Sequence, residues 1–242
     1  MPPKITRVRH VALGVESIDD TLRFYRDTLG LLVVADDVDE SGQRRVTLPA
    51  GLSAVVLIEE GLDRGVAHVA FDTDDASQPR AGHALDPSAH LGAAIMLYPP
   101  ITPPPAPTGH VLNIDHVVVS SGDSATVAAH FRDELGLEIK RTMARPGTNN
   151  HLEFGKLFDV VLEFAGPPEP RPGPVVAAFW GLVFCVDDID AVVAICRQAG
   201  YPTTDPRSAV QPGAKISAVK TGTGGVPFAL IQYNAMPISE AS

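Results

Sequence analysis

The sequence predicts an α+β fold made of repeated units, in which a short strand and a helix are followed by about three more strands. Three observations support this prediction. Residues 10–31 align without a gap on residues 116–137, at an offset of 106. A second pair of segments, residues 68–75 and 181–188, also repeats. Finally, 21 Gly and 22 Pro in 242 residues indicate many turns between short strands.

The first unit carries the signals of a helix with defined ends. Ser17 is a suitable N-terminal cap, because its hydroxyl can accept a hydrogen bond from the first turn. Leu22, Tyr25 and Leu29 fall on one helix face, and Gly30 suits the left-handed residue that ends the helix. The fourth unit repeats this pattern of an apolar stripe and a final glycine, at Ile189, Val192, Val193, Cys196 and Gly200.

The second unit is predicted to be reduced. Residues 76–92 contain Pro79, Pro87 and two glycines without a sustained apolar stripe, so we expect an irregular loop there. We interpret the Pro-rich residues 99–107 as a stiff segment between the last two strands of this unit, not as an interdomain linker. The strands are expected at residues 5–15, 45–48, 54–58, 93–98, 110–114, 151–154, 159–164, 215–220 and 227–233.

Charge and composition exclude several classes of protein. The 19 basic and 29 acidic residues give a net charge of −10, so we expect neither nucleic-acid binding nor attachment to anionic lipid. Residues 174–186, the longest apolar stretch, are fewer than the roughly 20 that span a bilayer, and no signal peptide is recognisable. Cys185 and Cys196 lie in apolar periodic segments and are expected to be buried thiols, which fits a cytoplasmic protein.

Motifs along both halves of the chain resemble one known family. HVALGV at residues 10–15 and SIDDTLRFYRDTLGL at 17–31 resemble the opening unit of the vicinal oxygen chelate superfamily. That superfamily includes glyoxalase I, methylmalonyl-CoA epimerase, extradiol dioxygenases, and bleomycin and fosfomycin resistance proteins. Residues 113–235 are similar in particular to its glyoxalase-like domain, through the motifs IDHVVV at 114–119, GTNN at 147–150, FWGL at 179–182, VDDID at 186–190 and VPFALIQ at 226–232.

This resemblance implies an architecture. Two βαβββ units pair into a half-open cup of mixed β-sheet, with the helices on the outside. We therefore expect two modules in tandem within one body, residues 1–112 and residues 113–242. The reduced second unit would leave one side of the first cup partly uncovered. The loop itself, the Pro-rich segment or a second subunit would close this apolar surface, and of these we expect a homodimer.

The resemblance also implies metal ligands, which come from the first and last strands of each unit. In the first cup His10 and His68 match the first-strand positions. The strand at 54–58 lacks the carboxylate of the family pattern, and Glu60, or else Glu59, at its end is the proposed third ligand. Alternation along residues 5–15 predicts which side chains share a face with His10, namely Val8, Ala12 and Gly14, with Val11, Leu13 and Val15 opposite.

The second cup keeps half of the family's ligand set. His116 and Glu163 match it, whereas Gly181 and Ala229 stand where His and Glu are usual. The alternative for His116 is a hydrogen bond to a neighbour in the core. The alternative for Glu163 is an ion pair with an arginine, Arg141 or Arg145.

Four residues of the second half are candidate substrate contacts: Asn149, Asn150, His151 and Trp180. The alternative for the first three is an ordinary turn followed by a strand. For Trp180 the alternative, which we expect, is burial in the core.

The resemblance leads to two hypotheses of function. In the first, the protein is an enzyme that uses a divalent metal, Fe, Mn, Ni or Zn, to act on a small oxygenated substrate as a lyase, isomerase or ring-cleaving dioxygenase. In the second, it is a metal-free protein that binds and sequesters a small molecule, as bleomycin-resistance proteins do. The missing ligands of the fourth unit favour the second hypothesis, and the pair His10 and His68 favours the first.

Overall fold

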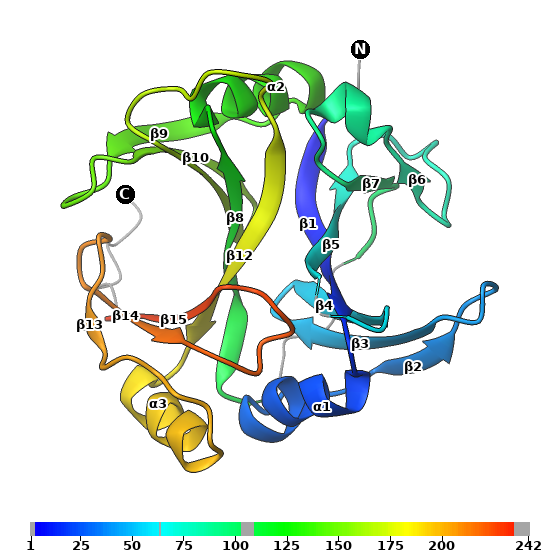
Figure 1. Cartoon of the computed structure of the whole chain (residues 1–242). Helices are drawn as coiled ribbons and strands as arrows, with labels where there is room; N and C mark the ends of the chain where they lie inside the picture. Colours follow the sequence, from blue (N-terminus) through cyan, green and yellow to red (C-terminus); the bar gives the residue numbers. More distant parts are fainter. Residues whose placement is uncertain (1–2, 63, 103–108, 235–242) are drawn as a thin grey trace, which may run out of the picture.

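The computed structural model describes residues 3–62, 64–102 and 109–234, which form two mixed β-sheets (Figure 1). The first sheet has the order β2-β3-β4-β1-β5-β7-β6. Its part of the chain comprises β1 (Ile5–Val15), α1 (Ile18–Leu22), the π-helix η1 (Arg23–Thr28), β2 (Ala35–Val38), β3 (Arg44–Ala50), β4 (Ser53–Glu59), β5 (Gly65–Thr73), β6 (His83–Ala84), the 3-10 helix η2 (Pro87–His90) and β7 (Ile95–Tyr98).

The second sheet has the order β13-β14-β15-β12-β8-β11-β10-β9. Its part of the chain comprises β8 (Val111–Ser121), α2 (Ser124–Leu135), β9 (Ile139–Ala144), β10 (His151–Leu157), β11 (Val160–Gly166), β12 (Ala177–Val186), α3 (Ile189–Gln198), β13 (Arg207–Ser208), β14 (Ala214–Val219) and β15 (Phe228–Tyr233).

The strand pairing repeats from unit to unit. The first strand of each unit is parallel to the last, in the pairs β1 with β4, β5 with β7, β8 with β11 and β12 with β15. The first strands of neighbouring units are antiparallel, β1 to β5 and β8 to β12. The predicted α+β class with paired units is therefore confirmed.

The residues predicted to begin and end the helices have these roles in the structure. The Ser17 hydroxyl accepts a hydrogen bond of 3.2 Å from the Asp20 N–H, and Gly30 adopts a positive φ of 77° after the helix. In the fourth unit Gly200 has a φ of 88°, and the predicted stripe of α3 is buried. The two cysteines are free and buried, as expected.

The second unit is reduced, but its connection differs from the prediction. Residues 76–92 hold only the two-residue strand β6 and the short helix η2. Residues 110–114 are not a last strand of this unit, because all but His110 belong to β8. The interpretation of residues 99–107 was therefore wrong: the segment leads from β7 to β8, and its residues 103–107 lie outside the described residues.

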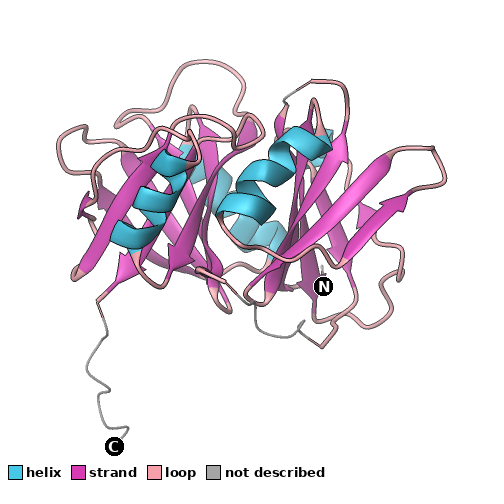
Figure 2. Ribbon diagram, turned by 90° about the horizontal axis from the view of Figure 1, so that it is seen from below, coloured by secondary structure: helices cyan, strands magenta, loops and turns pink. Residues whose placement is uncertain are grey.

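The two sheets lie back to back, with β1 and β5 beside β8 and β12, and their concave faces open in opposite directions (Figure 1). Figure 2 shows the helices lying along and between the sheets. One apolar cluster includes Val11 and Leu13 of β1 together with Val117 and Val119 of β8. The first unit's helix also reaches the second half, since the Tyr25 hydroxyl donates to the Thr223 carbonyl at 3.1 Å.

Because the two halves share this core, they pack together as one body. The module boundary at residues 112 and 113 stays a prediction, as does the homodimer. No helix in the described part of the chain combines the length and apolarity needed to cross a membrane.

Candidate functional site

A pocket of about 450 Å³ occupies the concave face of the first sheet. Its floor is formed by the central strands β1 and β5, which supply Arg9, His10 and His68. Three apolar side chains of β4 line one wall, Ala54, Val56 and Ile58. Polar groups therefore gather at the centre of the pocket beside an apolar surface, an arrangement typical of small-molecule sites.

A β-bulge in β1 decides which side chains enter this pocket. In the pairing with β5, Val8 lies opposite Phe71 and His10 opposite Ala70, so that Arg9 is the extra residue. Arg9 and His10 consequently both line the pocket. Val8 is fully buried in the main core, so the predicted alternation was wrong for this residue.

The two predicted imidazole ligands meet at the floor. His10 Nε2 lies 3.2 Å from His68 Nε2. Burial, together with the neighbouring His68, Arg9 and Arg45, lowers the pKa of His10 to about 3. Burial and Arg45 lower the pKa of His68 to about 4. Both rings are therefore neutral at pH 7, and one donates its N–H to the other.

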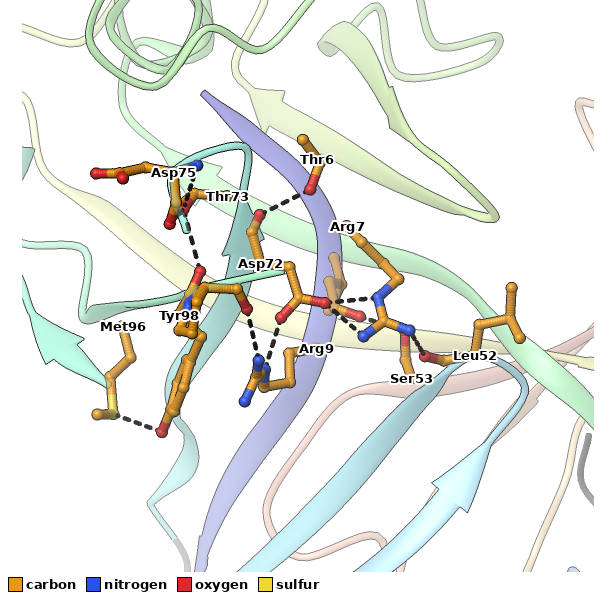
Figure 3. Close-up of polar contacts among 12 residues, drawn as sticks. Thr6, Arg7, Arg9, Leu52, Ser53, Asp72, Thr73, Asp75, Met96 and Tyr98 are labelled. Carbon is orange, nitrogen blue, oxygen red and sulfur yellow. Dashed lines mark hydrogen bonds and ion pairs between the residues drawn. The ribbon is translucent and has the colours of Figure 1, made fainter. Parts of the chain in front are cut away.

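Beside the imidazoles, one buried carboxylate holds two arginines (Figure 3). Asp72 Oδ2 accepts from Arg7 Nε at 2.8 Å, and Asp72 Oδ1 accepts from Arg9 Nε at 2.6 Å. The remaining Arg7 donor, Nη1, binds the Leu52 carbonyl at 3.0 Å. The Arg9 guanidinium lies 4.1 Å from the centre of the Tyr98 ring, within the range of a cation–π contact.

The structure does not bring the predicted carboxylate to the imidazoles. Glu60 is absent from the pocket lining, and its Oε2 pairs with Arg64 Nε at 3.0 Å. Glu59 also acts elsewhere, because its Oε1 accepts a hydrogen bond from the Ile18 N–H at the start of α1. Among the described residues no group of three His, Cys, Asp or Glu is arranged to bind a metal ion.

The donor set of the first cup does not match the metal site that the resemblance implies. The last strand of the first unit gives the pocket only apolar side chains, and β7 gives it Tyr98. A catalytic Zn²⁺ or Fe²⁺ site usually has three protein ligands. Among the described residues the two imidazoles have no third ligand arranged beside them, so they do not fit that requirement.

The second cup keeps His116 in a closed environment. His116 is 4% exposed, and its Nδ1 contacts the carboxylate of Asp115, which also accepts from the Tyr233 hydroxyl at 3.0 Å. Gln211 covers the other ring nitrogen, with Nε2 to Nε2 at 3.5 Å. Glu163 is half-buried on β11 and forms no ion pair with either of the arginines considered above, all of which are described residues.

The four candidate substrate contacts of the second half do not line the pocket of the first sheet. Asn149 has a positive φ of 56° and its N–H donates to the Arg145 carbonyl, so it belongs to the turn between β9 and β10. Asn150 follows in the same turn, and His151 Nε2 pairs with Glu153 Oε1 at 2.9 Å. Trp180 is 54% exposed, so the expectation of core burial was wrong.

Sequence reasoning missed the residues that surround the imidazoles, namely Arg9, Asp72 and Tyr98. One signal was available, because Asp72 interrupts the apolar strand at residues 66–71. A buried acid in a strand requires a positively charged partner. The arginines of β1 are the nearest candidates, because β1 is the strand paired with β5. Strict alternation along β1 does not predict the contact of Arg9 with Asp72, because the bulge at Arg9 shifts the side chains.

Comparisons with known proteins agree with the fold. The family model described as Glyoxalase/Bleomycin resistance protein/Dioxygenase superfamily matches residues 7–112 and, separately, residues 113–230. No curated protein sequence matches the chain.

Solved structures resemble the whole chain, or about half of it, at low sequence identity. A mutant of 4-hydroxymandelate synthase from Streptomyces coelicolor has a TM-score of 0.66 and 18% identity, over 98% of this chain and 94% of that chain. A xylose isomerase-like TIM barrel/4-hydroxyphenylpyruvate dioxygenase fusion protein has a TM-score of 0.65 and 13% identity, over 100% of this chain and 52% of that chain. Methylmalonyl-CoA epimerase from Mycobacterium tuberculosis has a TM-score of 0.45 and 16% identity, over 52% of this chain and 91% of that chain.

Proposed function

The chain belongs to the Glyoxalase/Bleomycin resistance protein/Dioxygenase superfamily, and we propose that it binds a small oxygen-bearing molecule, without a metal, in the pocket of its first sheet. The observation that carries this proposal is the pair of neutral imidazoles, His10 and His68, at the floor of a pocket of about 450 Å³. Pockets for small ligands commonly measure about 300 to 1,000 Å³.

The chemistry of the lining supports binding of such a molecule. The imidazole pair and Arg9 offer N–H donors to ligand oxygens, and Tyr98 offers a hydroxyl. The apolar side chains of β4 offer a surface to the hydrocarbon part of the ligand. A few polar groups beside an apolar wall fix the orientation of a ligand, while burial of its hydrocarbon supplies affinity.

A metal-dependent lyase, isomerase or dioxygenase is the competing function. One observation favours it, since 3.2 Å is also a suitable separation for two imidazole nitrogens that share one ion. Within the described part of the chain no third His, Cys, Asp or Glu is arranged with them to bind a metal ion, and this argues against it. Metal-dependent catalysis is therefore the second candidate function.

The proposal is tested by screening chelator-treated protein by ligand-observed NMR against small oxygenated molecules of both neutral and anionic types. We expect ligands that shift the imidazole signals of His10 and His68 and that lose affinity in the variant His68→Gln. The control is His83→Gln, because His83 is exposed on β6 and does not line the pocket. A screen without any such ligand, or with ligands that bind only after a divalent metal is restored, overturns the proposal.

A further inference from the structure

The buried cluster at the pocket carries one positive charge in excess. Arg7 and Arg9 share the single carboxylate of Asp72, and the exposed fractions of these side chains are only 7%, 17% and 3%. Two guanidinium groups and one carboxylate leave one positive charge without a partner in a region with little water. Because burial of an unpaired charge costs free energy, an anion in the pocket would stabilise this cluster.

Of the two arginines that share Asp72, Arg9 is the one that can reach such an anion. Arg7 uses all three of its nitrogens on Asp72 and the Leu52 carbonyl. Arg9 uses Nε on Asp72 and Nη2 on the Pro99 carbonyl at 2.8 Å. Its Nη1 forms no hydrogen bond with any residue that the structure describes, and the side chain lines the pocket. The contact with Tyr98 holds the plane of the guanidinium in place.

The charges around the imidazoles have the same sign. Apart from burial, the pKa of His10 is lowered by its neighbours His68, Arg9 and Arg45, and that of His68 by Arg45. Asp39 and Asp37 also line the pocket, but Asp39 pairs with Arg45 at 2.7 Å, and Asp37 is exposed to solvent, which screens its charge. The floor therefore lies in a positive field, which favours an anion and opposes a divalent cation.

From these observations we infer that the ligand is a small carboxylate. Its oxygens accept hydrogen bonds from Arg9 Nη1 and from an N–H of the imidazole pair, while its hydrocarbon part lies on Val56 and Ile58 of β4. A charge-assisted hydrogen bond to a guanidinium is stronger than one between neutral groups, so the charge of the ligand decides its affinity. This inference rests on the proposed function and names the class of ligand.

The test compares carboxylates with their neutral amides, for example benzoate with benzamide and phenylacetate with phenylacetamide, at constant ionic strength. We expect each bound carboxylate to bind about tenfold or more tightly than its amide. Arg9→Gln is expected to remove this difference by weakening only the carboxylate. Arg9→Lys is expected to restore part of it, since lysine keeps the charge but loses the planar fork. Arg132→Gln, in an exposed ion pair on α2, is the control and is expected to bind as the wild type does.

The possible failures are distinguishable. Amides that bind as tightly as carboxylates, or an Arg9→Gln protein that keeps the preference for carboxylates, overturn the inference and leave the proposed function standing. A protein that binds no member of either class, nor any neutral compound of the wider screen, overturns both. Circular dichroism of each variant establishes that it is folded before its affinity is interpreted.

Discussion

The Nε2 atoms of His10 and His68 lie 3.2 Å apart on the adjacent strands β1 and β5. This contact joins the first strands of two units of the repeat at the floor of the pocket. Because burial keeps both rings neutral, they share a hydrogen bond that two protonated rings could not form. The pair is therefore sensitive to pH.

The imidazole pair predicts a loss of stability in weak acid. The pKa values of His10 and His68 in the folded protein, about 3 and about 4, lie below the ordinary value of 6.5. As the pH falls below 6.5, the unfolded chain binds protons at these rings while the folded chain does not, so the free energy of unfolding decreases. Urea unfolding between pH 6.5 and pH 4.5 measures this slope.

The variant His10→Gln/His68→Gln should show a shallower slope over that range, because the two groups no longer take up protons on unfolding. The exposed His83→Gln variant should keep the wild-type slope. Equal slopes in the wild type and the double variant would contradict the burial and neutrality of the pair.

The hydrogen bond between Tyr25 and Thr223 links the first helix to the second half of the chain. Tyr25→Phe removes the donor and leaves a buried carbonyl without it, so we expect the free energy of unfolding to fall by about 1 to 3 kcal/mol. Tyr201→Phe is the matched control, because the hydroxyl of Tyr201 forms no hydrogen bond with a described residue. A larger loss in Tyr201→Phe than in Tyr25→Phe would argue against this link.

The shared core predicts that both halves unfold together. Phe131 of α2 packs against Phe164 and Phe179, and Phe179 in turn contacts Phe71 of the first sheet. Phe131→Ala should therefore lower the free energy of unfolding by about 3 to 5 kcal/mol. Phe158→Ala should have little effect, since Phe158 is 67% exposed.

Trp180 fluorescence follows the second half during urea unfolding of Phe131→Ala, and the NMR signals of His10 and His68 follow the first. We expect coincident midpoints from the two probes. Separate midpoints would indicate two independent modules instead of one cooperative body.

The second cup is predicted to have no part in ligand binding. His116→Gln removes one of the two contacts of a buried carboxylate, that of Asp115, so thermal stability should fall. The affinity for the ligand should equal that of the wild type, because His116 lies in the other sheet, away from the pocket. Loss of affinity in His116→Gln but not in His68→Gln would move the site to the second cup.

The repeat explains why the fold was predictable from the sequence. The alignment of His10 with His116 sets the unit, and caps such as Ser17 and Gly30 define the helices locally. The same logic placed His68 beside His10, since equivalent positions of paired units meet in one cup. These features depend on short stretches of sequence or on internal symmetry.

The chemistry around the imidazoles was less predictable. A bulge adds one residue to β1, so Arg9 enters the pocket and Val8 leaves it, and strict alternation cannot reveal such a shift. Glu60 was assigned by its place in the sequence, but Arg64 draws its carboxylate away from the pocket. Trp180 is exposed because it alternates along β12 with the buried Ala177 and Phe179, which places its side chain on the open face of the sheet.

Metal-free binding in the first cup is tested by measuring the affinity of one ligand from the NMR screen with and without divalent metal. The dissociation constant is determined by calorimetry in chelator-treated protein and again after addition of Zn²⁺, Ni²⁺, Mn²⁺ or, without oxygen, Fe²⁺. We expect the same constant in every case, and a loss of binding in His68→Gln whether metal is present or not. Binding that appears only with metal, and that disappears when His10 or His68 is replaced, would contradict a metal-free site and establish the imidazole pair as metal ligands.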